Sequence, residues 1–273
     1  LATTRAIIKL VEENKITLDQ KLKSILFFLK DSEKGNITIR HLLYHGSGLP
    51  AYRPYYKELI KLPSNKRRAV LSKMIVNEPL ENPVGEKTLY SDIGFMILSQ
   101  VIELLSDSSM NTYIYKNIYE PLNLDLFFID VNKVPVNKKF ASTEKCLWRN
   151  RALCGEVDDE NAYAVGGIEG HAGLFGTAEN IYELTAELMA VYNDKQTQGI
   201  FKRELLVEFF TRHPGTDRAL GFDTPAYKNS SSGSYFSYNS VGHLGFSGTS
   251  FWMDLERDII VILLTNRVQP SNT

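Results

Sequence analysis

The order of hydrophobic patterns along the chain is the strongest constraint on its fold. Apolar residues recur at helical spacing through much of the first 120 residues and again between 178 and 211. Two β-branched and aromatic segments follow, Val241–Asp254 and Ile259–Asn266, and predict a β-hairpin that turns around Glu256–Asp258. Helices followed by an antiparallel hairpin indicate an α+β fold, in which helices flank an antiparallel sheet and form a mostly helical lobe.

Capping residues, glycines and prolines set the boundaries of the predicted elements. The predicted helices cover the segment around Ile7–Val11, with apolar spacing continuing through Leu18, Leu22 and Ile25, and then Thr38–His45, Asn65–Val76, Ile93–Leu104, Thr112–Tyr119, Ala178–Asn193 and Lys202–Thr211. A strand is expected at Ala219–Phe222, whereas 130–176 loses periodicity and predicts a long loop region. We expect one domain over 1–273, with a mainly helical lobe at 20–175 and an α/β lobe formed by 1–19 and 176–273.

The charge balance excludes two classes of partner. Lys and Arg total 31 and Asp and Glu total 32, so the formal net charge is −1. Binding to nucleic acid or to an anionic membrane surface needs a basic excess, so neither partner is expected. The longest apolar runs, Ile25–Leu29 and Ile259–Leu264, are far shorter than the roughly 18 residues of a membrane span, so no integral membrane segment is expected.

The two cysteines, Cys146 and Cys154, match neither a Cys-X-X-Cys redox pair nor a zinc knuckle. Two independent thiols are favoured over a disulfide, although the sequence leaves both open. The spacing therefore predicts no redox or zinc chemistry.

Four short segments carry residues suited to acyl transfer. Tyr90–Asp92 stands at the start of a predicted helix, Gly170–Phe175 lies in the predicted loop, and His243–Thr249 lies on the predicted terminal strand. Leu42–Pro50 ends a helix with glycines and a proline. Acyl transfer requires a deprotonated nucleophile, a proton donor for the leaving group and fixed donors for the oxyanion.

In this order the four segments resemble the serine β-lactamase and penicillin-binding superfamily, specifically its class C-like esterases and peptidases, over nearly the whole chain. The resemblance implies a β-lactamase-like fold and a serine hydrolase that uses an acyl-enzyme and no cofactor or metal. Tyr90 matches the tyrosine that relays protons, and a nearby cation should lower its pKa. His243 matches the basic residue of the third motif. Without the family context, Tyr90 would be a tyrosine packed ahead of a helix, and His243 a solvent-facing strand histidine.

The same resemblance implies a substrate groove. Leu244 and Gly245 would border the strand edge along which a substrate lies, and the Phe246 N–H would be one of two oxyanion donors. His171 would also border the groove. For His171, a substrate contact and a hydrogen bond within its own loop are equally supported.

Two residues depart from the family pattern. Asp92 replaces an asparagine with an acid, and Leu244 replaces a hydroxyl residue that helps to hold the carboxylate of a β-lactam. Both changes disfavour β-lactam turnover and leave ester or amide hydrolysis open. The complete enzyme is therefore expected to prefer uncharged short esters to nitrocefin, unless a cation neutralises Asp92.

No Ser-X-X-Lys motif precedes Tyr90. The resemblance places that motif just before Leu1 on the same helix, so we expect the nucleophilic serine and its lysine upstream, and the isolated chain to be inactive. Ser142–Lys145 spells the motif, but it follows Tyr90 and lies in the irregular region. Tyr115–Asn117 spells Tyr-X-Asn within a short helix, where the tyrosine is expected to pack. Both are interpreted as chance matches.

Two possible metal arrangements are less well supported. His41 and His45 share a helix face at i, i+4, but no third ligand suggests itself, so packing beneath the site is favoured. The acids of Glu156–Asn161, including Asp158 and Asp159, lack the spacing of a calcium loop and predict a polar rim.

The sequence thus predicts a serine hydrolase that acts on an ester or amide, with small esters or cell-wall peptide derivatives as substrates. The alternatives are a muropeptide amidase or peptidase of the same fold, and a non-catalytic, peptide-binding pseudoenzyme. The expected partner is a small-molecule or peptide-like substrate. The oligomeric state stays open, as does the compartment, where the resemblance favours the cell envelope over the cytoplasm.

Overall fold

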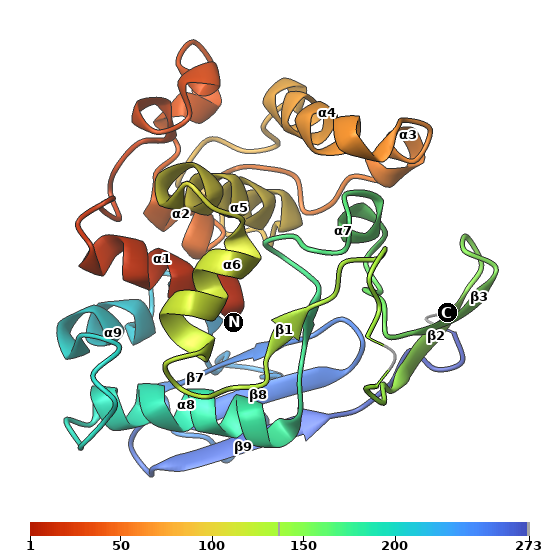
Figure 1. Cartoon of the computed structure of the whole chain (residues 1–273). Coiled ribbons are helices and arrows are strands. Elements are labelled where there is room, and N and C mark those ends of the chain that lie inside the picture. The colour runs from red at the N-terminus through yellow and green to blue at the C-terminus, as the bar shows by residue number, and fades with distance from the viewer. Residues whose placement is uncertain (136, 272–273) are drawn as a thin grey trace.

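The computed structural model describes residues 1–135 and 137–271. The helices are α1 (Ala2–Glu12), α2 (Ile39–Leu43), α3 (Tyr56–Leu59), α4 (Ser64–Asn77), α5 (Asp92–Ser106), α6 (Met110–Ile114), α7 (Glu160–Ala164), α8 (Ala178–Tyr192) and α9 (Arg203–Phe210) (Figure 1). The strands are β1 (Phe127–Phe128), β2 (Ser142–Cys146), β3 (Arg151–Cys154), β4 (Leu174–Phe175), β5 (Arg218–Ala219), β6 (Phe222–Asp223), β7 (Ser240–Leu244), β8 (Thr249–Asp254) and β9 (Ile259–Leu264). Short 3-10 turns occupy Leu22–Ser24, Phe27–Leu29 and Glu33–Asn36, and a π-helical turn occupies Tyr115–Tyr119.

The main sheet has five antiparallel strands in the order β5-β6-β7-β8-β9, so β9 is an edge strand. Helix α8 packs along the sheet at β9 (Figure 1). The predicted single strand Val241–Asp254 is wrong, because it forms a hairpin of its own: β7 and β8 pair from Ser240↔Asp254 to Leu244↔Ser250. Gly248 makes that turn possible, since its φ of +108° lies in a region that favours glycine.

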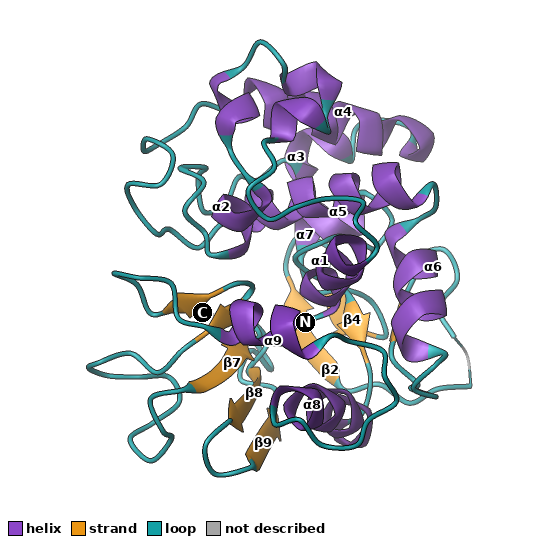
Figure 2. Cartoon of the chain, turned by 90° about the vertical axis from the view of Figure 1, so that its left-hand side faces the viewer, coloured by secondary structure: helices purple, strands orange, loops and turns teal. Residues whose placement is uncertain are grey.

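Helices α2, α3, α4 and α5 gather at one end of the molecule, the sheet with α8 beside it lies at the other, and α1 lies between them (Figure 2). Helix α1 packs against α5 and α6, and α2 packs against α5. One cluster of buried apolar residues joins the two ends, since it contains Ile7 and Leu10 of α1, Val101 of α5, and Val241 and Met253 of the sheet. The predicted α+β class, with an antiparallel sheet flanked by helices, is confirmed.

Within the described residues, no single helix is long and apolar enough to cross a membrane. One pair, α5 together with Met110–Tyr119, reaches the required length and composition only jointly, across a bend of 70°.

Five of the predicted helices are confirmed. The helices predicted at 38–45, 65–76, 93–104, 178–193 and 202–211 correspond to α2, α4, α5, α8 and α9, with ends that differ by at most two residues. Helical spacing through residues 18–25 instead gives short 3-10 turns. The strand predicted at Ala219–Phe222 is split into β5 and β6, because Gly221 turns the chain with φ of +78°.

The long loop predicted at 130–176 is wrong in part. It holds the antiparallel hairpin β2–β3, helix α7, and strand β4, which pairs with β1. Ser142–Lys145 therefore lies on β2 and does not open a helix. Cys146 is buried, Cys154 is exposed and both are free thiols, as favoured. Tyr115 is exposed, so the prediction that it packs is wrong.

Candidate active site

Hydrogen bonds fix the segment Tyr90–Asp92 at the start of α5. Ser91 is the N-cap: its Oγ accepts from the Gly94 N–H at 3.2 Å and donates to the Pro50 carbonyl at 2.6 Å. The Ser91 N–H donates to Nδ1 of His45 at 3.1 Å. Tyr90 is thereby held partly exposed and Asp92 half-buried at the helix entrance, while Ser91 itself is buried.

His45 packs beneath this segment, as predicted. Its backbone adopts φ of +62°, and its ring centroid lies 4.5 Å from that of Tyr90. Burial lowers the pKa of His45 well below its usual value, so the ring is neutral and Nδ1 can accept the Ser91 hydrogen bond. His41 serves a different purpose, because its ring completes the capping box of α2 with Thr38. The two histidines are therefore structural residues.

Tyr90 lies against His243 and Arg218. Its ring centroid is 6.1 Å from that of His243, and Cζ of Arg218 lies 5.7 Å from the Tyr90 centroid. Burial raises the pKa of Tyr90, the Asp92 carboxylate raises it further, and the Arg218 guanidinium only partly opposes them. The predicted fall in the pKa of Tyr90 depends on the lysine of the Ser-X-X-Lys motif, which is not among these residues, so it stays a prediction. In these surroundings the Tyr90 hydroxyl keeps its proton at neutral pH.

His243 lies on β7 opposite Phe251 of β8. Burial lowers the pKa of His243 to about 4, so the ring is neutral at pH 7. Nδ1 lies 2.6 Å from the Leu244 carbonyl oxygen, which can only accept a hydrogen bond, so Nδ1 carries the single proton. Nε2 is consequently an acceptor. The third-motif position thus supplies a proton acceptor rather than a positive charge.

Arg218 brings a cation that the sequence analysis missed. It lies on β5, pairs with Asp223 of β6, and reaches the face of Tyr90. Burial lowers the pKa of Arg218, although the group remains a cation at pH 7. No motif surrounds Arg218. It reaches Tyr90 because β5 pairs with β6 and β6 pairs with β7.

The N-terminal end of α1 reaches the same place. The Thr4 hydroxyl donates to the Gly221 carbonyl at 3.5 Å, and Cζ of Arg5 lies 5.5 Å from the centre of the Phe222 ring. Arg5 is fully buried, and its guanidinium donates to the Leu1 carbonyl at 2.6 Å. The first turn of α1 thus packs against the turn between β5 and β6, beside the strand that carries His243.

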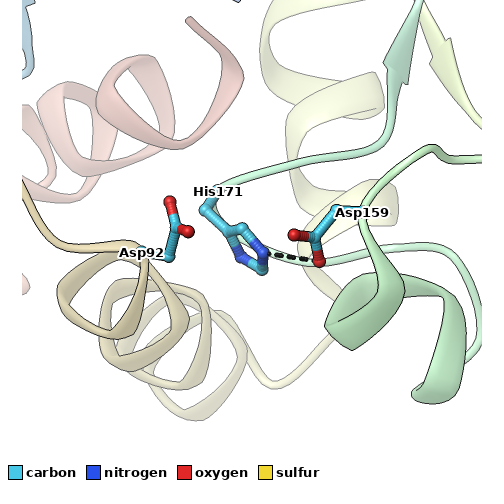
Figure 3. A group of neighbouring side chains, drawn as sticks. All are labelled: Asp92, Asp159 and His171. Carbon is cyan, nitrogen blue, oxygen red and sulfur yellow. Dashed lines mark hydrogen bonds and ion pairs between the residues drawn. The ribbon is translucent and has the colours of Figure 1, made fainter. Parts of the chain in front are cut away.

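A second group lies beyond Tyr90: Asp92 of α5, Asp159 and His171 (Figure 3). Nε2 of His171 lies 2.9 Å from Oδ1 of Asp159, and one possible ligand atom of each residue lies within 4.8 Å of the others. Burial alone would lower the pKa of His171, but the charge and hydrogen bond of Asp159 raise it to about 9. Burial raises the pKa of Asp92, which the His171 charge partly offsets.

This arrangement corrects two expectations. His171 binds a residue of another segment and not its own loop. Asp159 is the N-cap of α7, where it accepts from the Ala162 N–H at 2.7 Å, so it is not part of a polar rim. The sequence offered a signal for Asp159, since an acid followed by helix-forming residues is a typical N-cap.

Close packing fixes the loop that carries His171. A Cβ on Gly170 would collide with the Phe95 carbonyl of α5, and the Thr3 hydroxyl of α1 donates to the Gly170 carbonyl at 2.5 Å. The loop therefore lies directly on α5 and α1. Only glycine allows this approach at position 170.

The predicted groove residues lie where β7 ends. Leu244 is exposed and Phe246 is 62% exposed, with Cζ of Arg267 5.3 Å from the centre of its ring. The Gly245 N–H donates to the Thr249 carbonyl at 2.7 Å and closes the turn toward β8. The structure thus brings Tyr90 and His243 together, brings Asp92 and His171 together, and leaves Leu244 and Phe246 at an open end of the sheet.

Known proteins resemble this chain over nearly its whole length. The sequence model of the Beta-lactamase family matches residues 1–273. An N-acetylmuramyl-L-alanine amidase of Bacillus subtilis (strain 168) is 30% identical over 291 residues, which cover 97% of this chain and 65% of that protein. A putative D-alanyl-D-alanine carboxypeptidase of Escherichia coli (strain K12) is 30% identical over 293 residues, which cover 97% of this chain and 66% of that protein.

The structural likeness agrees with the sequence likeness. A penicillin-binding protein from Bacillus halodurans has a TM-score of 0.71 at 20% identity, covering 97% of this chain and 78% of that one, which indicates a shared fold. The chain spans about two thirds of the length of the amidase and the carboxypeptidase. The chain belongs to the Beta-lactamase family.

Proposed function

We propose that the full protein is a serine hydrolase that cleaves an amide or ester bond in cell-wall peptide derivatives through an acyl-enzyme. The observation that carries this proposal is the contact between Tyr90 and His243 at the N-terminal end of α1, with Arg218 beside the tyrosine. A protonated phenol next to a neutral imidazole that accepts at Nε2 is suited to moving protons during acyl transfer. Tyr90 donates to the leaving group, and the Phe246 N–H is one oxyanion donor.

The nucleophile in this proposal is the serine of a Ser-X-X-Lys motif that continues α1 on its N-terminal side. The direction of α1 supports this, since its first turn packs on Gly221 and Phe222, beside the strand that carries His243. Ser91 is unsuited to the role, because it is buried and its hydroxyl donates to the Pro50 carbonyl. The lysine of the motif takes the serine proton as the acyl-enzyme bond forms.

The named relatives support the choice of substrate. One bears the name of an amidase that acts at N-acetylmuramyl-L-alanine, and the other that of a D-alanyl-D-alanine carboxypeptidase. Both names denote hydrolysis of cell-wall peptides, which favours an enzyme of the cell envelope over a non-catalytic binding protein. The matched family and the relatives support a hydrolase. Cleavage by a serine is our own proposal.

The test uses the full protein and three substrates: a muropeptide, p-nitrophenyl acetate and nitrocefin. We expect muropeptide cleavage, an initial burst with the ester, and an acyl adduct on one serine detected by mass spectrometry. Muropeptide binding without turnover of any substrate would establish a pseudoenzyme instead. Turnover that leaves no trappable adduct and stops on metal chelation would contradict the serine mechanism.

Tyr90→Phe tests the role of the phenol. It should lower kcat by about 10² to 10⁴-fold, the usual contribution of general acid–base catalysis, while the unfolding midpoint stays near that of the parent. Tyr182→Phe is the matched control, because Tyr182 is an exposed tyrosine on α8. If Tyr90→Phe retained activity within threefold, Tyr90 would be only a packing residue.

A further inference from the structure

From the geometry of Asp92, Asp159 and His171 we infer that His171 is a positioning residue. Its ring is held by Asp159 and carries a second proton on the side of Asp92. The Asp92 carboxylate can then accept a hydrogen bond from the substrate while the His171 charge compensates its own. The inference rests on the proposed function, because it assigns Asp92 to the substrate peptide. It also explains how an acid can occupy a position at which the family carries a neutral amide.

The ring of His171 is held between two carboxylates (Figure 3). The Nε2–H group of His171 donates a hydrogen bond to Asp159, since an ionised carboxylate can only accept one. Nδ1 is buried and has no hydrogen-bond partner among the described residues, and the side chain of His171 is 3% exposed. A neutral ring, with only one proton, would leave two carboxylates with oxygen atoms within 4.8 Å of each other and no cation beside them, which is unfavourable in a half-buried site.

The surrounding charges leave this role to His171. Among the described residues that shift the pKa of Asp92, His171 is the only cation, and Asp159 acts in the opposite direction. Glu169 also faces His171, but it pairs with Arg68 at 3.7 Å and accepts from the Ser99 hydroxyl. Its charge is therefore already shared with other partners.

Two further elements face the group. Glu160 of α7 lies close enough to Asp159 and Tyr52 for their charges to interact, and burial raises the pKa of Glu160. Arg149 lies near Asp159 but directs its guanidinium to Glu156 and to backbone carbonyls. Neither supplies a proton donor for Asp92, so the imidazolium of His171 is the compensating charge.

The substrate class follows from what a compensated carboxylate can do. Asp92 can accept a hydrogen bond from a backbone N–H of a peptide substrate without repelling an anionic peptide. A simple ester such as p-nitrophenyl acetate has no N–H to offer. Loss of His171 should therefore impair peptide substrates much more than the small ester.

The test is a double-mutant cycle in the full protein with His171→Gln and Asp92→Asn. His171→Gln should lower kcat/KM for the muropeptide about 10 to 100-fold and for p-nitrophenyl acetate less than threefold. Adding Asp92→Asn should restore muropeptide activity to within fivefold of the parent, because a neutral amide needs no cation. His213→Gln is the control, since His213 stacks on Tyr44 outside the site.

A merely structural role gives a different result. If the double variant stays as impaired as His171→Gln, or if the ester is lost equally, the inference is overturned. Imidazole NMR of the unsubstituted protein supplies an answer that needs neither a variant nor activity. Both ring nitrogens of His171 should be protonated at pH 7.5, and a singly protonated ring overturns the inference.

The same three side chains offer ligand atoms for a divalent cation, so Zn²⁺ alone is the second probe. Zn²⁺ must displace the proton of His171, which weakens its binding, so we expect no micromolar binding at pH 7 by calorimetry. Micromolar binding that Asp159→Asn abolishes would make this a metal site and overturn the inference. Failure of the proposed hydrolase leaves the NMR and Zn²⁺ results unaffected, so the two outcomes are distinguishable.

Discussion

Three imidazoles surround Tyr90–Asp92, and each is held in the protonation state that its neighbours impose. Burial lowers the pKa of His45 and of His243, so both are neutral and each uses Nδ1 in a backbone hydrogen bond. Asp159 raises the pKa of His171 to about 9. The same residue type thus gives an acceptor on one side of the segment and a cation on the other, and no motif distinguishes these roles.

The raised pKa of His171 predicts how stability depends on pH. In the unfolded chain the pKa of His171 is near 6.5. The contribution of its protonation to the unfolding free energy is therefore fully present below pH 6.5 and is lost as pH rises through about 9. The unfolding free energy of the parent should therefore approach that of His171→Gln over this range. Urea unfolding at several pH values measures the difference.

His213→Gln is the control for this experiment. Burial lowers the pKa of His213, so its contribution to the unfolding free energy changes with pH below 6.5. Between pH 6.5 and 9 that contribution is constant. Parallel curves for the parent and His171→Gln between pH 6.5 and 9 would contradict the protonated state of His171.

At the scale of the element, the start of α5 is held by one hydroxyl. Ser91→Ala removes the N-cap and leaves the Pro50 carbonyl without its donor, so we expect a loss of about 2–3 kcal/mol in unfolding free energy. Thr177→Ala, at the exposed N-cap of α8, should cost about 1 kcal/mol or less. Equal losses in urea unfolding would show that the buried hydrogen bond of Ser91 adds nothing.

The elements that the sequence predicts well are those with local signals. Helices α5 and α8 carry a capping hydroxyl and an apolar stripe within their own segments, which is all that a sequence pattern can read. Strands β5 and β6 have two residues each and exist because they pair across a turn. The hairpin β2–β3 likewise depends on pairing and was missed.

The same distinction separates the site residues. Tyr90 and His243 stand within recognisable motifs, so their meeting was predictable from the resemblance. Arg218 and Asp159 reach the site only through tertiary packing, from β5 and from the cap of α7. The pKa of Tyr90 also depends on tertiary packing, because burial and the Asp92 charge outweigh the neighbouring Arg218 cation.

At the scale of the whole molecule, the edge strand β9 exposes apolar side chains to solvent. Ile259, Val261 and Leu263 are exposed by 46%, 46% and 53%, while Ile260 and Ile262 between them pack on the core. Edge strands of this kind promote pairing between chains, so we expect the 273-residue chain to self-associate. Val261→Lys should weaken that association about tenfold, or 1.4 kcal/mol, measured by analytical ultracentrifugation.

The control places the same charge elsewhere on the surface. Tyr227→Lys changes a residue that is 97% exposed in the loop between β6 and β7, so it should not alter self-association. A parent chain that sediments as a monomer, or two variants with equal effects, would exclude β9 as the contact.

We expect helix α1 to be a rigid support of the candidate site. Its residues from Ala2 to Ile8 are all buried, and it packs between the helical end and the sheet (Figure 2). Amide protons of such a helix exchange with solvent only when the whole molecule unfolds, whereas exposed turns open locally. We therefore expect slow exchange in α1 to persist whichever ligand is bound, and any adjustment to a substrate to occur in the turn that carries Phe246.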